Sequence, residues 1–198
     1  MLILFIAYDL WGTGVYTQNA QRDLTRDLQH DWGSPSGGGT ADKIHLVDGH
    51  GFAVIRIPRF GKRYHFVILE GTSEATLRRG PGHYKGTALP GRRGNFVVSG
   101  HRTTYEAPFN KAGELRHGDE IIVDTKTREY VYKVTETKVV VPTDVAVTYP
   151  VPFHRDATPR HAMITLTTCH PMYSATHRLI IFGRLAERRA RTGTTGEG

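Results

Sequence analysis

Short runs of β-branched and aromatic residues, separated by turn residues, fill the chain from Phe52 onward. Runs of this length at this spacing are typical of an all-β barrel or sandwich. Residues 120–124 and 129–141 are joined by a short polar segment, which predicts a hairpin. The predicted strands are residues 52–57, 64–69, 95–99, 120–124, 129–141, 163–168 and 178–185. The sequence therefore predicts an all-β domain with only short helices.

Two other segments of this domain have recognisable signals. Ser73 can cap the start of a short helix over residues 73–79, and Gly80 and Pro81 would end it. Residues 142–160 form a Pro-rich connection between two predicted strands. This connection is longer than most, so we expect it to be functional or to be ordered by its own contacts.

The N-terminal part of the chain has a different character. Its first eleven residues are apolar apart from Asp9, which is too short a stretch to span a membrane and lacks the features of a signal peptide. We interpret it as the outer end of a membrane anchor. The predicted divisions of the chain are residues 1–15 as a truncated membrane-anchor remnant, 16–32 as a stalk helix, 33–45 as a flexible linker, 46–186 as the β-barrel domain and 187–198 as a disordered tail.

Composition excludes several classes of protein. Hydrophobic residues make up 38% of the chain and aromatic residues 10%, which argues against collagen-like, coiled-coil and wholly disordered proteins. The formal net charge is +7. The basic residues are scattered and belong to no recognisable nucleic-acid-binding module, so no nucleic-acid partner is predicted.

Cys169 is the one cysteine of the chain, so no intramolecular disulfide can form. It directly follows the predicted strand over residues 163–168, where a side chain would reach the rim of a barrel. A lone cysteine is often a small buried hydrophobic residue, and that alternative remains open here. The other interpretation is a nucleophile.

Two further residue types would complete the chemistry of a thiol nucleophile. His101 follows a predicted strand and could donate and accept a proton, and Arg178 opens an apolar strand and could stabilise a developing oxyanion. The alternatives are a surface histidine and an arginine that extends to solvent. His170 is adjacent to Cys169 and His177 is close in sequence, so both are further candidates.

A zinc site built from Cys169, His170, His177 and His101 is the main competing interpretation of the same residues. Their spacing matches no known zinc pattern, because a second close pair of ligands is missing. The Gly-rich residues 80–91 lack the Gly-Lys-Ser/Thr end of a phosphate-binding loop. We therefore predict no metal and no cofactor.

Three segments together resemble the sortases, the cysteine transpeptidases of Gram-positive cell walls. Residues 165–169 read Thr-Leu-Thr-Thr-Cys, residues 99–102 read Ser-Gly-His-Arg, and Arg178 follows the cysteine by nine positions. Residues 80–84 and 141–145 add weaker similarities. The resemblance covers the chain from about Phe52 to Leu185.

The resemblance is strongest to class E sortases of high-GC Gram-positive bacteria. It rests on His170-Pro171 after the cysteine, on Thr103-Thr104-Tyr105 after the histidine segment and on the basic composition. It implies an eight-stranded sortase-type β-barrel. It also implies a single-pass membrane protein with its catalytic domain outside the cell.

The resemblance further implies cleavage of a C-terminal sorting signal, of Leu-Ala-x-Thr-Gly or Leu-Pro-x-Thr-Gly type, between Thr and Gly. The partners would be secreted proteins that carry this signal and an amine of a peptidoglycan precursor. Cys169 would be the nucleophile, His101 the general acid and base, and Arg178 the oxyanion stabiliser. Thr168 and Tyr105 would contact substrate.

The loop of residues 142–160 would form one wall of the substrate groove. It lacks the acidic cluster with which many class A sortases bind calcium, so no calcium requirement is predicted. A cysteine hydrolase acting on the same peptides and a non-enzymatic surface-binding module remain the alternatives.

Overall fold

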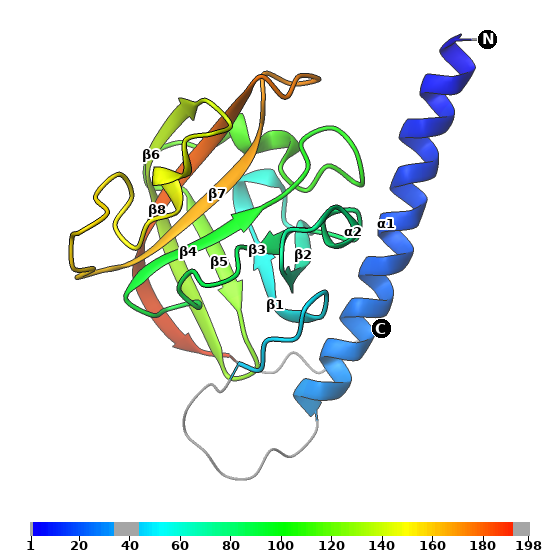
Figure 1. The fold of residues 1–198 in the computed structure, drawn as a ribbon. Helices are drawn as coiled ribbons and strands as arrows, with labels where there is room; N and C mark the ends of the chain where they lie inside the picture. Colours follow the sequence, from blue (N-terminus) through cyan, green and yellow to red (C-terminus); the bar gives the residue numbers. More distant parts are fainter. Residues whose placement is uncertain (1, 34–43, 192–198) are drawn as a thin grey trace.

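Eight strands form a closed barrel in the order β1-β2-β3-β4-β7-β8-β6-β5 (Figure 1). The computed structural model describes residues 2–33 and 44–191, with the backbone alone for residues 2–13. The strands are β1 Gly51–Arg56, β2 His65–Glu70, β3 Gly82–His83, β4 Gly94–Ser99, β5 Glu120–Asp124, β6 Arg128–Val140, β7 Ala162–His170 and β8 His177–Ala190. The prediction of an eight-stranded all-β barrel is confirmed.

The described helices are few and, with one exception, short. They are α1 Leu2–Gly33, α2 Glu74–Leu77 and the 3-10 helices η1 Pro58–Phe60, η2 Asn110–Glu114 and η3 Val145–Thr148. The predicted cap of α2 is present, because the Ser73 side chain accepts a hydrogen bond from the backbone N–H of Thr76. The predicted connection between β6 and β7 contains η3.

The structure departs from the predicted strands in three places. The two-residue strand β3 was not predicted, because a segment so short shows no alternation. Strand β7 continues through Cys169 to His170, so the cysteine lies within the strand instead of following it. Strand β8 runs to Ala190, four residues into the range predicted as tail. Of the linker predicted over residues 33–45, positions 34–43 lie outside the described residues, as does the part of the predicted tail from position 192.

The barrel core comes from side chains that alternate along the strands. Phe96 and Val98 on β4, Ile164 and Leu166 on β7, and Ile181 on β8 are fully buried in one cluster. Since successive residues of a strand point to opposite faces, the residues between them lie on the outer face. This alternation fixes which strand residues can form a site on the outside of the barrel.

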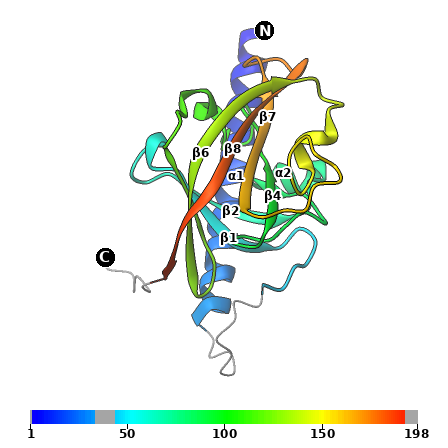
Figure 2. The same cartoon turned by 90° about the vertical axis from the view of Figure 1, so that its left-hand side faces the viewer.

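Strands β4, β7 and β8 are neighbours, with β4 parallel to β7 and β7 antiparallel to β8. The register places Ser99 of β4 beside Thr167 of β7, and Thr167 beside Ile180 of β8. Figure 2 shows β7 and β8 running side by side, with the connection that carries η3 folded next to them. These three strands form the floor on which the predicted site residues lie.

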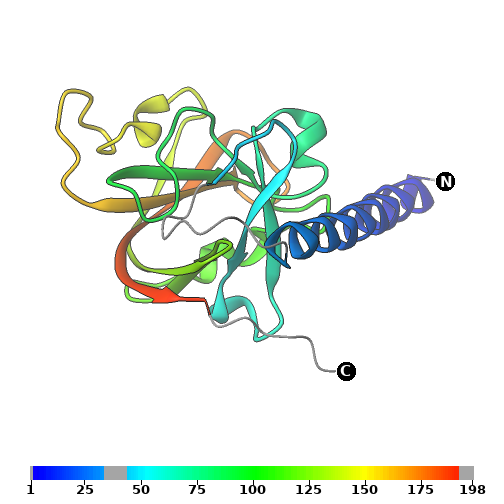
Figure 3. The same ribbon diagram turned by 90° about the horizontal axis from the view of Figure 1, so that it is seen from below.

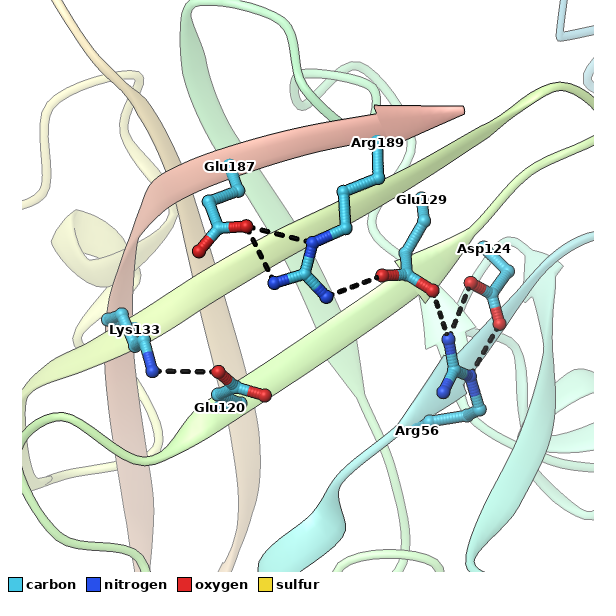
Figure 4. A network of polar contacts seen from close by, with 7 residues as sticks. All are labelled: Arg56, Glu120, Asp124, Glu129, Lys133, Glu187 and Arg189. Carbon is cyan, nitrogen blue, oxygen red and sulfur yellow. Dashed lines mark hydrogen bonds and ion pairs between the residues drawn. The ribbon is translucent and has the colours of Figure 1, made fainter. Parts of the chain in front are cut away.

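A network of charged side chains closes the barrel where β1 meets β5 (Figure 4). Arg56 donates to Asp124 over 2.6 and 3.0 Å and to Glu129 over 2.6 Å, and Arg189 joins Glu129 to Glu187. The hydrogen bonds that Arg56 donates to Asp124 raise the pKa of Arg56, against the opposing effect of burial. Strands β1, β5, β6 and β8 are thereby tied together at one end of the barrel.

Helix α1 packs its C-terminal half against β1 and β2, while its N-terminal part projects beyond the barrel (Figure 3). Leu24 and Leu28 are 4% exposed and form a cluster with Val67 and Leu69 of β2. The segments predicted as an anchor remnant and a stalk thus form one continuous helix, of which the second part docks on the barrel. Among the described helices we find none with an apolar stretch of the length needed to cross a membrane.

The side chain of Gln21 fastens α1 to the barrel. Its Oε1 accepts from the backbone N–H of Val67 over 2.7 Å, and its Nε2 donates to the carbonyl oxygens of Arg79 and Val67 over 2.8 and 3.3 Å. Gly80 makes this approach possible, since a Cβ there would lie 2.2 Å from Gln21 Nε2. The amide of Gln21 therefore satisfies backbone groups that a neighbouring strand would otherwise pair.

Candidate active site

Cys169 and Arg178 are cross-strand partners in the antiparallel pair of β7 and β8. Residues directly opposite in such a pair have Cβ atoms about 5 Å apart on the same face of the sheet. Both residues are half-buried, so they are held by the sheet and remain reachable from outside. The eight residues between them form the end of one hairpin, which brings two residues nine positions apart in sequence side by side.

The alternation along β7 places Cys169 on the outer face. Ile164 and Leu166 point into the core, so Thr165, Thr167 and Cys169 point outward. Val147 of η3 packs on the same outer face, against Ile180 and Phe182 of β8. The connection between β6 and β7 therefore lies over the sheet beside Cys169, where the sequence predicts a wall of the site.

Asn95 of β4 holds this connection in place. Its Nδ2 donates to the carbonyl oxygens of Val147 and Tyr149 over 2.9 and 3.1 Å, and its Oδ1 accepts from the hydroxyl of Thr165 over 2.7 Å. Asn95 is 1% exposed, and these bonds satisfy its buried amide. The wall beside Cys169 is thereby fixed to β4 and β7.

His101 lies two residues beyond the end of β4, and the register of β4 with β7, continued by two residues, places it beside Cys169. Ser99, Thr167 and Ile180 form one row across β4, β7 and β8. Two residues further along β7, Cys169 begins the next row on the same face, and its partner on β8 is Arg178. Since neighbouring strands lie about 4.8 Å apart, Cys169 stands between His101 and Arg178.

Gly100, the residue before His101, is bonded to β7 through both its N–H and its carbonyl oxygen. The Gly100 N–H donates to the Thr167 carbonyl over 3.1 Å, and the Thr168 hydroxyl donates to the Gly100 carbonyl over 2.8 Å. Gly100 has room for no side chain, because a Cβ would lie 2.7 Å from the ring of Phe109. The glycine of the Ser-Gly-His-Arg segment is therefore required by packing.

The imidazole of His101 has one nitrogen poised for a further partner. Its Nε2 is buried and has no hydrogen-bond partner among the described residues, while its Nδ1 lies 3.4 Å from the Thr104 hydroxyl. Burial lowers the pKa of His101, and the positive charge of Arg78 lowers it further, against an opposite effect of Glu74. An unsatisfied nitrogen and a lowered pKa are both typical of a residue that transfers protons.

This geometry has counterparts among known proteins. The sequence matches the sortase domain family over residues 55–186, which is more than half of the chain. The chain belongs to the sortase family. Sortases are cysteine transpeptidases, and their domains typically lie outside the cell.

The relatives of this sortase include class E members. It is 34% identical over 200 residues to Sortase SrtE1 of Streptomyces coelicolor, a match that covers 97% of this chain and 55% of that protein. The sortase thus spans about half the length of this curated relative. The resemblance to class E sortases is confirmed by this relationship.

Solved structures agree with the fold. Sortase E of Streptomyces avermitilis is 40% identical with a TM-score of 0.67, and the match covers 73% of this chain and 93% of that one. Sortase E1 of Streptomyces coelicolor, solved with a tripeptide in its active site, is 36% identical with a TM-score of 0.66. That match covers 74% of this chain and 94% of the other.

The two predicted substrate contacts of the sortase lie in different places. The Tyr105 ring centroid is 4.9 Å from that of His101, and Tyr105 adopts a left-handed φ of 54°. Thr168 is 3% exposed and points to the face opposite Cys169, where its hydroxyl bonds Gly100. The structure therefore places Tyr105 beside His101 and Thr168 on the face opposite Cys169.

Arg178 contacts backbone oxygens of its own hairpin. Its Nη1 donates to the carbonyl oxygens of Ala175 and His177, both over 3.0 Å. Within the described residues it forms no ion pair with a carboxylate. The guanidinium is thus oriented by neutral groups, and its charge is available to an anion that forms beside Cys169.

One residue of the site was not assigned a role from the sequence. Arg102, which follows His101, is only 8% exposed, and its Nη1 donates to the Cys169 carbonyl over 3.1 Å. The signal was present in the Ser-Gly-His-Arg segment, but sequence alone does not show that this arginine turns inward beneath Cys169.

The alternative zinc site finds no support in the geometry. Across the described residues, which include Cys169, His101, His170 and His177, no three metal-binding side chains form a group able to hold an ion. His170 instead lies 2.9 Å from Arg102 through its Nδ1. A cationic neighbour at that nitrogen is incompatible with metal binding there.

Proposed function

We propose that this sortase cleaves a peptide bond in a sorting signal through a thioacyl intermediate on Cys169 and transfers the acyl group to an amine. The observation that carries the proposal is the cross-strand pair of Cys169 and Arg178, with His101 two residues past the end of β4, the strand next to β7. The thiol is the central member of these three, with a proton carrier on one side and a permanent cation on the other.

In the first half of the reaction, the Cys169 thiolate attacks the carbonyl carbon of the scissile bond. The electron pair of the carbonyl moves onto oxygen, and Arg178 stabilises that negative charge. His101, protonated at this point, gives its proton to the departing amine as the C–N bond breaks. The lowered pKa of His101 makes its imidazolium a stronger acid for this step.

In the second half, an acceptor amine attacks the thioester carbonyl. Neutral His101 takes a proton from the attacking nitrogen, and the C–S bond breaks with the electron pair returning to sulfur. The products are a new amide and the original thiolate with imidazolium. Because the thioester conserves the acyl energy, attack by the amine can remake a peptide bond.

We infer that the substrate signal is of Leu-Ala-x-Thr-Gly or Leu-Pro-x-Thr-Gly type, cleaved between Thr and Gly, and that the acceptor is a peptidoglycan precursor amine. The likeness to class E sortases supports the choice of signal. The tripeptide in the active site of Sortase E1 supports recognition of a peptide by this sortase. Tyr105, packed on His101, is the proposed contact for the second position of the signal. Thr168 affects the substrate indirectly, because its hydroxyl holds Gly100 beside His101.

The test is mass spectrometry of the protein incubated with peptides that differ only in the second position of the signal. The expected result is a thioacyl adduct on Cys169 and, with triglycine present, a ligated product. Cys169→Ala should give neither. Normal turnover by Cys169→Ala would refute the mechanism.

The same experiment separates the alternatives. A cysteine hydrolase would release free acid at the same rate with and without triglycine. A non-enzymatic binding module would form no adduct, and Cys169 would be inert to alkylation. Addition of calcium or of a chelator should leave the transfer rate unchanged, and a several-fold rise with calcium would contradict the proposed independence from metal.

We also propose that the sortase acts on the extracellular side of the cell membrane. The apolar start of the chain would be part of its membrane anchor. The projection of α1 beyond the barrel supports this arrangement (Figure 3). Flotation with lipid vesicles should recover the chain and lose a version that starts at residue 16. Equal recovery of both would contradict the anchor.

A further inference from the structure

A buried arginine lies directly beneath the proposed nucleophile. Arg102 is 8% exposed, and its Nη1 donates to the carbonyl oxygen of Cys169 over 3.1 Å and contacts Nδ1 of His170 at 2.9 Å. Its Nε is buried without a hydrogen-bond partner among the described residues. Arg102 therefore binds two consecutive residues at the end of β7 with one nitrogen.

This cation lacks the partner that buried charges usually have. In the described part of the chain, the carboxylates that form ion pairs with arginine belong to other sites, such as Asp124 with Arg56 and Glu74 with Arg78. A buried guanidinium without a carboxylate is costly, since its lost hydration is repaid by neutral groups alone. The anion close to Arg102 is the thiolate that Cys169 can form.

The electrostatics of Arg102 agree with this assignment. Burial lowers the pKa of Arg102, and the negative charge of a Cys169 thiolate acts in the opposite direction. Arginine stays protonated in proteins even when burial opposes it. The interaction is mutual, because a thiolate that stabilises the charged form of Arg102 is itself stabilised by Arg102.

The contact with Arg102 selects the tautomer of His170. Arginine can only donate, so Nδ1 of His170 must accept, and the ring proton resides on Nε2. The carbonyl of Cys169 and the ring of His170 are held by the same donor, which fixes the direction of the strand end.

We propose that Arg102 is a positioning residue that holds Cys169 through its carbonyl and favours the thiolate form of its sulfur. The inference rests on the proposed role of Cys169 as nucleophile and adds a fourth residue to His101, Cys169 and Arg178. Arg102 acts from the buried side of the strand end, whereas Arg178 acts from the same face as the sulfur.

Other charged groups around Cys169 must be accounted for in any test of this proposal. Arg178 faces it from β8, His101 from the segment after β4, and His170 adjoins it on β7 with His177 opposite. Arg178 and His101 are unchanged in an Arg102 variant, so a difference from the native chain isolates the contribution of Arg102.

The experiment is the pH dependence of Cys169 alkylation by iodoacetamide, followed by intact mass. Since Cys169 is the one cysteine of the chain, each added group reports on it alone. In Arg102→Gln the alkylation midpoint should move to higher pH, and the rate at pH 7 should fall about tenfold, as expected for loss of a neighbouring cation. Arg102→Lys should retain at least half of the effect.

Arg92→Gln is the matched control. Arg92 is exposed and lies before the opposite end of β4, so this variant removes the same charge at a distance. Its alkylation profile should coincide with that of the native chain. A merely structural role for Arg102 would lower the unfolding temperature of Arg102→Gln without moving the alkylation midpoint, and an unmoved midpoint overturns the proposal.

A measurement on the native chain covers the case in which Arg102→Gln does not fold. Nitrogen-15 NMR should find His170 as the Nε2–H tautomer at neutral pH, and the Nδ1–H tautomer would contradict the contact with Arg102. Neither measurement uses a peptide substrate. Failure of peptide transfer therefore counts against the proposed function alone, and an unmoved midpoint counts against the role of Arg102.

Discussion

The hydroxyl of Thr168 donates a hydrogen bond of 2.8 Å to the carbonyl oxygen of Gly100. This bond joins the residue before the proposed nucleophile to the residue before the proposed general acid and base. Thr168 is almost fully buried, so the bond is shielded from water. The relative position of Cys169 and His101 therefore depends on a side chain that lies behind both of them.

Thr168→Val should separate this role from simple stability. The change keeps the shape of the side chain but leaves the Gly100 carbonyl without this donor, at a cost of about 1–2 kcal/mol in the free energy of unfolding. Peptide transfer should fall about tenfold or more, because the His101 segment loses its link to β7. Denaturant titration and transfer rates measure the two effects.

The control is Thr125→Val, in the turn between β5 and β6. Thr125 is also buried and donates to the Arg128 carbonyl over 3.0 Å, at the end of the barrel away from Gly100. It should show a comparable loss of stability with a much smaller loss of transfer. Equal losses of transfer in both variants would mean that Thr168 acts only through stability.

Arg178→Gln should slow acylation of Cys169 by on the order of 100- to 1,000-fold, as loss of an oxyanion donor does in other enzymes. Its contacts within the fold are with the exposed carbonyl oxygens of Ala175 and His177, so the unfolding temperature should change little. Arg184→Gln, at an exposed position of β8, should acylate at the native rate. The rate of thioacyl adduct formation is the measurement, and full acylation by Arg178→Gln would contradict the assignment.

The pKa of His101 should respond in opposite directions to changes at two neighbours. Arg78→Gln removes a positive charge that lowers this pKa, so the pKa should rise, whereas Glu74→Gln removes a negative charge that raises it, so the pKa should fall. NMR titration of the His101 ring measures both shifts, with Arg92→Gln as a control that should leave it in place. Shifts in the same direction would contradict the electrostatic assignment.

The same lowered pKa has a consequence for stability. The folded chain binds fewer protons at His101 than the unfolded chain, in which the pKa is about 6.5. The contribution of His101 to stability is therefore fully present above about pH 6.5 and declines as the pH falls toward its folded-state pKa. Arg78→Gln should reduce this decline, which denaturant titrations at several pH values would detect.

Gln21→Ala should loosen helix α1. The Val67 N–H and the Arg79 carbonyl would lose their partners, which we expect to cost about 2 kcal/mol in the free energy of unfolding. Gln18→Ala removes an exposed bond to Glu106 and should cost less than about 0.5 kcal/mol. Denaturant titration compares the two, and equal costs would show that Gln21 is not the main attachment.

The strand pattern was predictable because alternating apolar residues determine which face of each strand is buried. Residues 120–124 were predicted with the observed bounds, and β4 and β6 were within a residue at each end. Strand β3 could not be found, because its two residues owe their pairing to the neighbours β2 and β4. The docking of α1 depends on Gln21 reaching backbone groups of β2, and no pattern within the helix reveals that.

For the site, sequence order and strand ends were sufficient to select Cys169, His101 and Arg178 as candidates. Register then supplied what sequence could not, namely that Cys169 and Arg178 are direct partners. The inward turn of Arg102 was missed because an arginine beside a loop histidine is exposed in most proteins. Thr168 was chosen for its place next to the cysteine, and the alternation of the strand sends it to the other face.

The attachment of Gln21 to β2 determines how a mechanical pull would travel through the molecule. Tension applied at the N-terminal end of α1 is transmitted to the barrel through the bonds of Gln21 to Val67 and Arg79. These bonds lie closer to that end than the chain that follows Gly33. Glu106, bonded to Gln18 of the same helix, follows Tyr105 beside His101. If α1 tethers the protein, tension on the tether would therefore act on the barrel close to Tyr105 and His101.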